Sequence, residues 1–91
     1  MERIKIVFSG QVQGVGFRVF VKKIALNYNC TGYVKNLSDT SLVECELQAQ
    51  TDTLNNVLNI ILKGNIFIKI NNYSIKTINT ISNDSSFNII N

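Results

Sequence analysis

The stretch "RIKIVFSGQVQGVGFRVFVKKIALNY", residues 3–28, contains a strand pattern, a glycine-rich loop and a helix pattern in direct succession. Residues 3–9 alternate, with Ile4, Ile6 and Phe8 on one side, which predicts a strand with one buried face. After the loop, apolar residues recur at helical spacing and predict an amphipathic helix. They are Phe17, Phe20, Val21, Ile24, Ala25 and Tyr28.

The residues that follow predict a hairpin and a second helix. Segments 30–36 and 42–49 are strand candidates, and the turn residues of "LSDTS" between them favour a hairpin. Thr51 or Asp52 can cap the second helix, and Gly64 stands where a C-terminal cap belongs. The apolar stripe of this helix is Leu54, Val57, Leu58, Ile61 and Leu62.

The last part of the chain adds strands. Residues 66–78 have a strand pattern that shifts phase near Asn71–Asn72, which indicates a β-bulge, and a short fifth edge strand can form at 87–90. The order β-α-β-β-α-β predicts an α+β, ferredoxin-like sandwich with two helices packed on one face of an antiparallel sheet. The length of 91 residues predicts a single domain over residues 1–91.

The charge and hydrophobicity of the chain limit the kinds of ligand and partner that we expect it to bind. The net charge of +3 suits an anionic ligand, but the Lys and Arg residues are scattered and form no nucleic-acid-binding stripe. No segment approaches the ~20 apolar residues that span a bilayer, so no membrane association is expected. Nothing at the N-terminus resembles a secretory signal, and we therefore expect a cytoplasmic protein, by default a monomer.

The two cysteines, Cys30 and Cys45, are too few for a zinc site, and the chain has no histidine to complete one. We expect them to be reduced thiols in the core, although pairing stays open if their strands are neighbours. No metal or other cofactor is expected.

The loop holds three of the five glycines, Gly10, Gly14 and Gly16. A Walker A loop fails because no lysine follows at the required place, and a dinucleotide fingerprint fails because position 19 is valine. Glycines before a helix can instead let successive amide N–H groups converge on an anion, and Arg18 can add a bidentate contact to phosphate. A plain tight turn is the alternative.

Two stretches, "GQVQGVGFR" and "GYVKNLSD", closely resemble the signature stretches of the acylphosphatase family. The first matches at Gly10, Val12, Gln13, Gly14, Val15, Gly16, Phe17 and Arg18, and the second at Gly32, Val34, Asn36, Leu37 and Asp39. Chain length and element order are also similar to those of the family. The hairpin turn departs from it, because Thr40-Ser41 follows Asp39 where relatives usually have glycine.

The resemblance implies a function. Arg18 matches the family's phosphate-binding arginine and Asn36 its water-orienting asparagine. The phosphate-binding loop corresponds to Gln13, Gly14, Val15, Gly16, Phe17 and Arg18. The implied reaction is hydrolysis of an acyl phosphate to a carboxylate and inorganic phosphate.

The residue inventory suits such a substrate. A carboxylate whose conjugate acid has a pKa of about 4 to 5 can leave without being protonated, so the lack of histidine is no obstacle. The enzyme then needs to bind the phosphoryl oxygens and to aim a water in line. A substrate phosphate oxygen can accept the proton of the water.

Other functions stay open at this point. The main alternative is a ferredoxin-like module that binds phosphate-containing ligands without catalysis. An RNA-recognition domain is disfavoured because strand 42–49 lacks aromatic residues and carries Glu44 and Glu46. A carbamoyl-phosphate-handling domain of hydrogenase maturation factors and an inactive relative are further alternatives.

Overall fold

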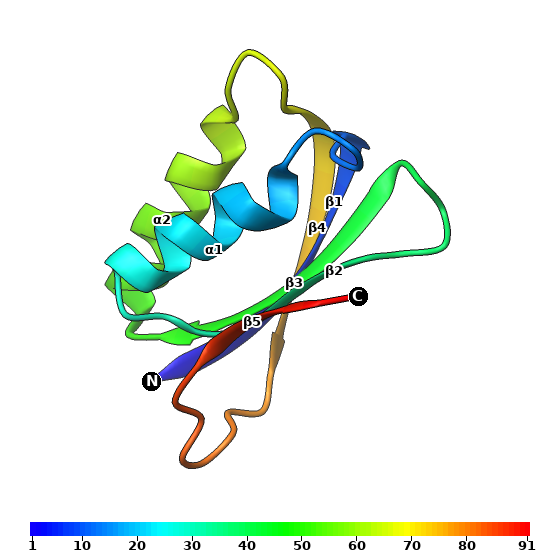
Figure 1. The fold of residues 1–91 in the computed structure, drawn as a ribbon. Coiled ribbons are helices and arrows are strands. Elements are labelled where there is room, and N and C mark those ends of the chain that lie inside the picture. Colours follow the sequence, from blue (N-terminus) through cyan, green and yellow to red (C-terminus); the bar gives the residue numbers. More distant parts are fainter.

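Two helices cover one face of a five-stranded sheet in this computed structural model, which describes residues 1–91 (Figure 1). The elements are β1 (Glu2–Gln11), α1 (Phe17–Asn27), β2 (Thr31–Asn36), β3 (Leu42–Ala49), α2 (Thr51–Lys63), β4 (Lys69–Ile78) and β5 (Phe87–Ile90). The strand order is β4-β1-β3-β2-β5. The predicted ferredoxin-like α+β fold is confirmed, but the sheet is mixed rather than antiparallel, because β5 runs parallel to β2.

The core lies between the sheet and the helices. The side of β1 formed by Ile4, Ile6 and Phe8 is buried as predicted. Phe8 meets Phe17 edge to face, with ring centroids 5.2 Å apart, and this contact ties β1 to the first residue of α1. The predicted stripe of α1 is buried except at Phe20, which is partly buried, and at its end, where Tyr28 is 42% exposed.

Several boundaries refine the sequence prediction. The bulge is confirmed, since the β1–β4 register passes from Ser9 opposite Asn72 to Gly10 opposite Ile70. The last long strand begins at Lys69, later than predicted. The expected cap of α2 is wrong: the N-cap is Gln50, without a side-chain cap hydrogen bond. Gly64 is the C-terminal cap, as predicted.

Cys30 and Cys45 are buried and unpaired, and burial raises the pKa of each thiol. Neither helix has the length and hydropathy that a bilayer-spanning helix requires.

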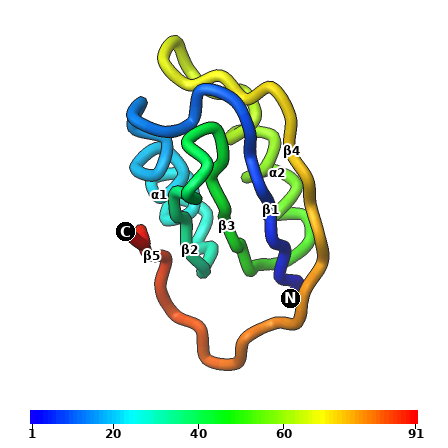
Figure 2. The backbone as a smooth tube through the Cα atoms, turned by 90° about the vertical axis from the view of Figure 1, so that its right-hand side faces the viewer, coloured from blue at the N-terminus to red at the C-terminus, as the bar shows by residue number.

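The face of the sheet that carries no helices holds a buried polar network, which alternation alone did not predict. Arg3 is 3% exposed; its Nε donates to Glu46 Oε1 at 2.7 Å and its Nη1 donates to Asp84 at 2.8 Å. The Gln48 amide pairs with the main chain of Ile81 at 2.9 and 2.8 Å. These contacts hold the segment between β4 and β5, which crosses from one sheet edge to the other (Figure 2).

The contacts within this network shift the pKa values of Glu46 and Tyr33. Burial opposes the charge on Glu46, but hydrogen bonds from Arg3 and the Tyr33 hydroxyl hold the pKa of Glu46 below its ordinary value. Burial and hydrogen bonds to Glu44 and Glu46 raise the pKa of Tyr33. Arg3 is therefore the central cation of the network.

The loop before α1 is tied to the β2–β3 hairpin turn. Gln13 Nε2 donates to the main-chain carbonyls of Leu37, Asp39 and Leu42 at 2.8, 3.1 and 2.8 Å. A single amide group thereby joins two loops that lie 24 or more residues apart in the chain. The turn is itself braced, since Asp39 Oδ1 accepts hydrogen bonds from the backbone N–H and hydroxyl of Ser41.

We predict that Arg3→Met lowers the free energy of unfolding by about 3 kcal/mol, because it leaves the buried Glu46 carboxylate without its closest cation. Urea unfolding measures the change. The matched control is Lys5→Met, whose more exposed ammonium lies 3.7 Å from the same carboxylate and should contribute less than about 1 kcal/mol. Equal losses in the two variants would contradict the central role of Arg3.

We predict that Gln13→Glu destabilises the protein by about 1–3 kcal/mol, because an ionised carboxylate cannot donate to the three carbonyls. Thermal and urea unfolding give the measurement. Gln11→Glu introduces the same charge at an exposed position two residues away and serves as the control. An indistinguishable stability of the two variants would show that the tie contributes nothing.

Candidate active site

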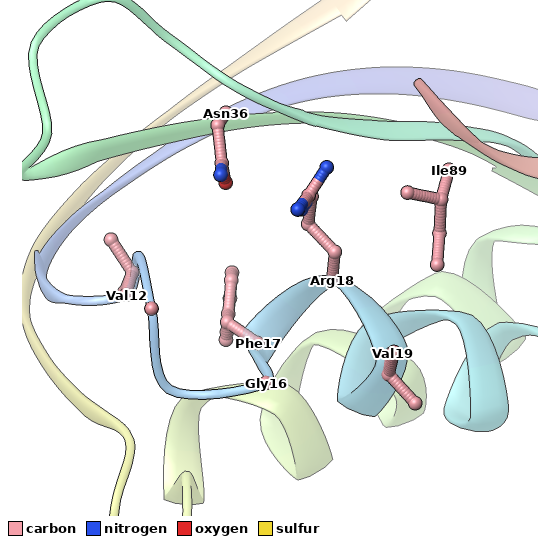
Figure 3. Close-up of a pocket in the computed structure, with 8 residues that line it drawn as sticks. Val12, Gly16, Phe17, Arg18, Val19, Asn36 and Ile89 are labelled. Atoms are coloured by element: carbon pink, nitrogen blue, oxygen red, sulfur yellow. The ribbon is translucent and has the colours of Figure 1, made fainter. Parts of the chain in front are cut away.

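A cavity of about 140 Å³ opens where the loop after β1, the start of α1, the end of β2 and strand β5 meet (Figure 3). Four of the residues that line the cavity are apolar. Arg18 is the only lining residue with a charged side chain. The lining residues are Val12, Gly14, Gly16, Phe17, Arg18, Val19, Asn36 and Ile89. The cavity therefore combines one positive charge with a partly apolar lining.

Two glycines shape the loop side of the cavity. Gly14 and Gly16 have φ values of +73° and +78°, which glycine adopts without strain. A Cβ at either position would meet nothing within 4 Å, so the backbone conformation and not lack of space calls for glycine. The open space above these residues leaves their main chain accessible to a ligand.

Gly16 is also the N-cap of α1, and it provides no side chain to cap the helix. The first turn contains no acidic residue. Amide N–H groups at a helix N-terminus lack intrahelical partners and, together with the helix dipole, favour an anion. The start of α1 is thus suited to bind a negatively charged group.

Arg18 projects from the first turn of α1 into the cavity (Figure 3). Its Nη1 donates to Asn91 Oδ1 at 2.9 Å, a contact that sequence reasoning did not find. Because a guanidinium has five N–H donors, this hydrogen bond leaves others for a ligand. The parallel pairing of β5 with β2 brings the end of the chain to Arg18.

Asn36 is the last residue of β2 and pairs with Val43 of β3, whose side chain is in the core. Since paired residues point to the same face, Asn36 also points toward the helices. Its Oδ1 is buried and has no hydrogen-bond partner in the protein. Figure 3 shows this amide directed from β2 toward the loop and Arg18.

The structure brings together most of the residues singled out from the sequence. Gly14, Gly16, Phe17, Arg18 and Asn36 line the cavity. The side chains of the other two predicted loop residues do not, because Gln13 binds the hairpin turn and Val15 packs on the core.

Three lining residues, Val12, Val19 and Ile89, were not among the predicted site residues. The only sequence signal for Ile89 was the expected edge strand at 87–90, whose pairing partner could not be predicted. Asp39, the acidic residue of the second motif, lies in the hairpin turn and does not line the cavity. Its hydrogen bonds from Ser41 lower its pKa.

Comparison with known proteins gives consistent results over the whole chain. A family model described as acylphosphatase matches residues 4–89. The acylphosphatase of Clostridium acetobutylicum is 44% identical over 90 residues, covering 99% of this chain and 98% of that protein. The crystal structure of acylphosphatase from Bacillus subtilis has a TM-score of 0.93 at 30% identity and covers 100% of both chains. HypF from T. kodakarensis matches with a TM-score of 0.86 at 30% identity, but over only 12% of its own length.

The family model and the two proteins matched over the length of both chains all carry the description acylphosphatase. A non-catalytic binding module is therefore set aside. The chain belongs to the acylphosphatase family and is a hydrolase of acyl phosphates.

Proposed function

We propose that the cavity holds the phosphoryl group of an acyl phosphate while a water oriented by Asn36 attacks phosphorus in line. The new bond joins the water oxygen to phosphorus, and the bond from phosphorus to the acyl oxygen breaks. The electron pair leaves with the carboxylate, and a phosphate oxygen accepts the proton of the water. The products are a carboxylate and inorganic phosphate.

The loop and Arg18 supply the phosphate contacts in this proposal. The backbone N–H groups of residues 13–18 bind the phosphoryl oxygens, so Gln13 and Val15 contribute through the main chain alone. The left-handed conformations of Gly14 and Gly16 support such convergence of amides. Arg18 neutralises the charge with the donors that Asn91 leaves free.

The observation that carries the proposal is the unpartnered Oδ1 of Asn36. A buried acceptor without a hydrogen bond costs about 1–3 kcal/mol, so such atoms generally have a partner. A water in the cavity would donate to this oxygen and would be held beside the phosphoryl group. Water positioning of this kind accelerates the reaction because it fixes the attack geometry before the bond forms.

In this proposal, hydrolysis of an acyl phosphate needs neither a general acid nor a metal ion. The carboxylate is a good leaving group, so no general acid is required. Arg18 and the amides supply the positive charge that a metal ion provides in other phosphoryl transfers. The expected cytoplasmic location and monomeric state stay predictions.

We predict that the purified protein hydrolyses benzoyl phosphate without added metal and at an unchanged rate in excess EDTA, because Arg18 and the loop amides neutralise the phosphoryl charge. The fall in ultraviolet absorbance as benzoyl phosphate is consumed measures the rate. Loss of activity in EDTA that returns with Mg²⁺ would contradict the metal-free mechanism.

We predict different effects for the two central side chains. Asn36→Ala should reduce kcat by about 10²-fold or more because the water is no longer aimed, while inorganic phosphate still inhibits at the same concentration. Arg18→Ala should lose both turnover and inhibition by phosphate.

The control for Arg18→Ala is Lys22→Ala, which removes the same charge one helical turn further along and outside the cavity. Lys22→Ala should retain both kcat and phosphate inhibition. A parallel loss of phosphate inhibition in Asn36→Ala would refute the assigned role of Asn36.

A further inference from the structure

Val19 and Ile89 form an apolar wall beside Arg18. Val19 follows Arg18 in α1 and is 51% exposed, whereas Ile89 belongs to β5 and is partly buried against the core. Both line the cavity that contains Arg18 and Asn36. In Figure 3, Arg18 lies between Asn36 and these two side chains.

The position of this wall follows from the sheet. Ile89 pairs in parallel with Val34 of β2, and Val34 is fully buried under the helices. Ile89 therefore faces α1 as Val34 does, and β5 packs against α1. The remaining apolar lining residues, Val12 and Phe17, are each 1% exposed and therefore offer little surface to a ligand.

We propose that Val19 and Ile89 bind the acyl group of the substrate, so that the enzyme favours acyl phosphates with an apolar acyl group, aromatic or branched. This inference rests on the proposed function. In-line attack puts the leaving carboxylate on the side of phosphorus away from the water, and hence away from Asn36. With the phosphoryl group at Arg18, that side is the one occupied by Val19 and Ile89.

The wall also discriminates against polar substrates. Apart from Asn36 and Arg18, which hold the water and the phosphate, no polar side chain lines the cavity. A hydroxylated or charged acyl group would lose water on binding without gaining a hydrogen bond. An apolar acyl group loses no such bonds and removes its own surface and that of the wall from water.

The test measures kcat/KM for benzoyl phosphate and for acetyl phosphate in variants of Val19 and Ile89. Val19→Thr replaces a methyl group by a hydroxyl, and Ile89→Thr replaces an ethyl group by a hydroxyl, so both variants and their combination stay branched at Cβ but become polar. For the double variant, kcat/KM with benzoyl phosphate should fall about tenfold. With acetyl phosphate it should change less than twofold, and the inhibition constant of inorganic phosphate should be unchanged.

The control is Leu26→Thr, because Leu26 is 53% exposed on the same helix and does not line the cavity. It should leave both substrates unaffected. If phosphate inhibition is intact and kcat/KM changes equally for the two substrates, or not at all, then Val19 and Ile89 do not bind the acyl group. The proposed mechanism of hydrolysis would be unaffected by that result. Hydrolysis of neither substrate by the unaltered protein would overturn both. If Ile89→Thr fails to fold, Val19→Thr alone still decides, since it alters an exposed side chain.

Discussion

The edge-to-face contact between Phe8 and Phe17 is the interaction on which the site depends. Both rings are in the core, so the end of β1 and the start of α1 have fixed positions. The loop between them must therefore turn within a few residues, and Gly14 and Gly16 make this turn possible. Arg18 follows Phe17 directly, and its position in the cavity is a consequence of the same packing.

The two faces of the sheet contribute to the site in different ways, and the segment between β4 and β5 connects them. The helix-covered face holds the core and the cavity. On the opposite face, Arg3 and Gln48 hold the segment that leads from β4 to β5. That segment delivers β5 to the edge of β2, where β5 contributes Ile89 to the cavity. A polar network on the opposite face of the sheet from the cavity thus helps to place one of the residues that line it.

Much of the fold and the central residues of the site could be predicted, because the signals are local. Alternation along β1 and helical spacing after the loop identify the core faces, and the family motifs single out Arg18 and Asn36. The burial of Arg3 could not be predicted. A charged residue on the outer side of a strand is expected in water, but Arg3 contacts Glu46 on a neighbouring strand and Asp84, which lies 81 residues away in the chain.

By itself, the sequence determined the element order, the family and the glycine loop, since each depends on residues close together in the chain. The tertiary structure decided which strands are neighbours, and hence that β5 runs parallel to β2. It also turned the Gln13 side chain to the hairpin and left the Asn36 Oδ1 unpartnered in the cavity. These outcomes depend on contacts between distant segments, and such contacts arise only when the hydrophobic core brings the segments together.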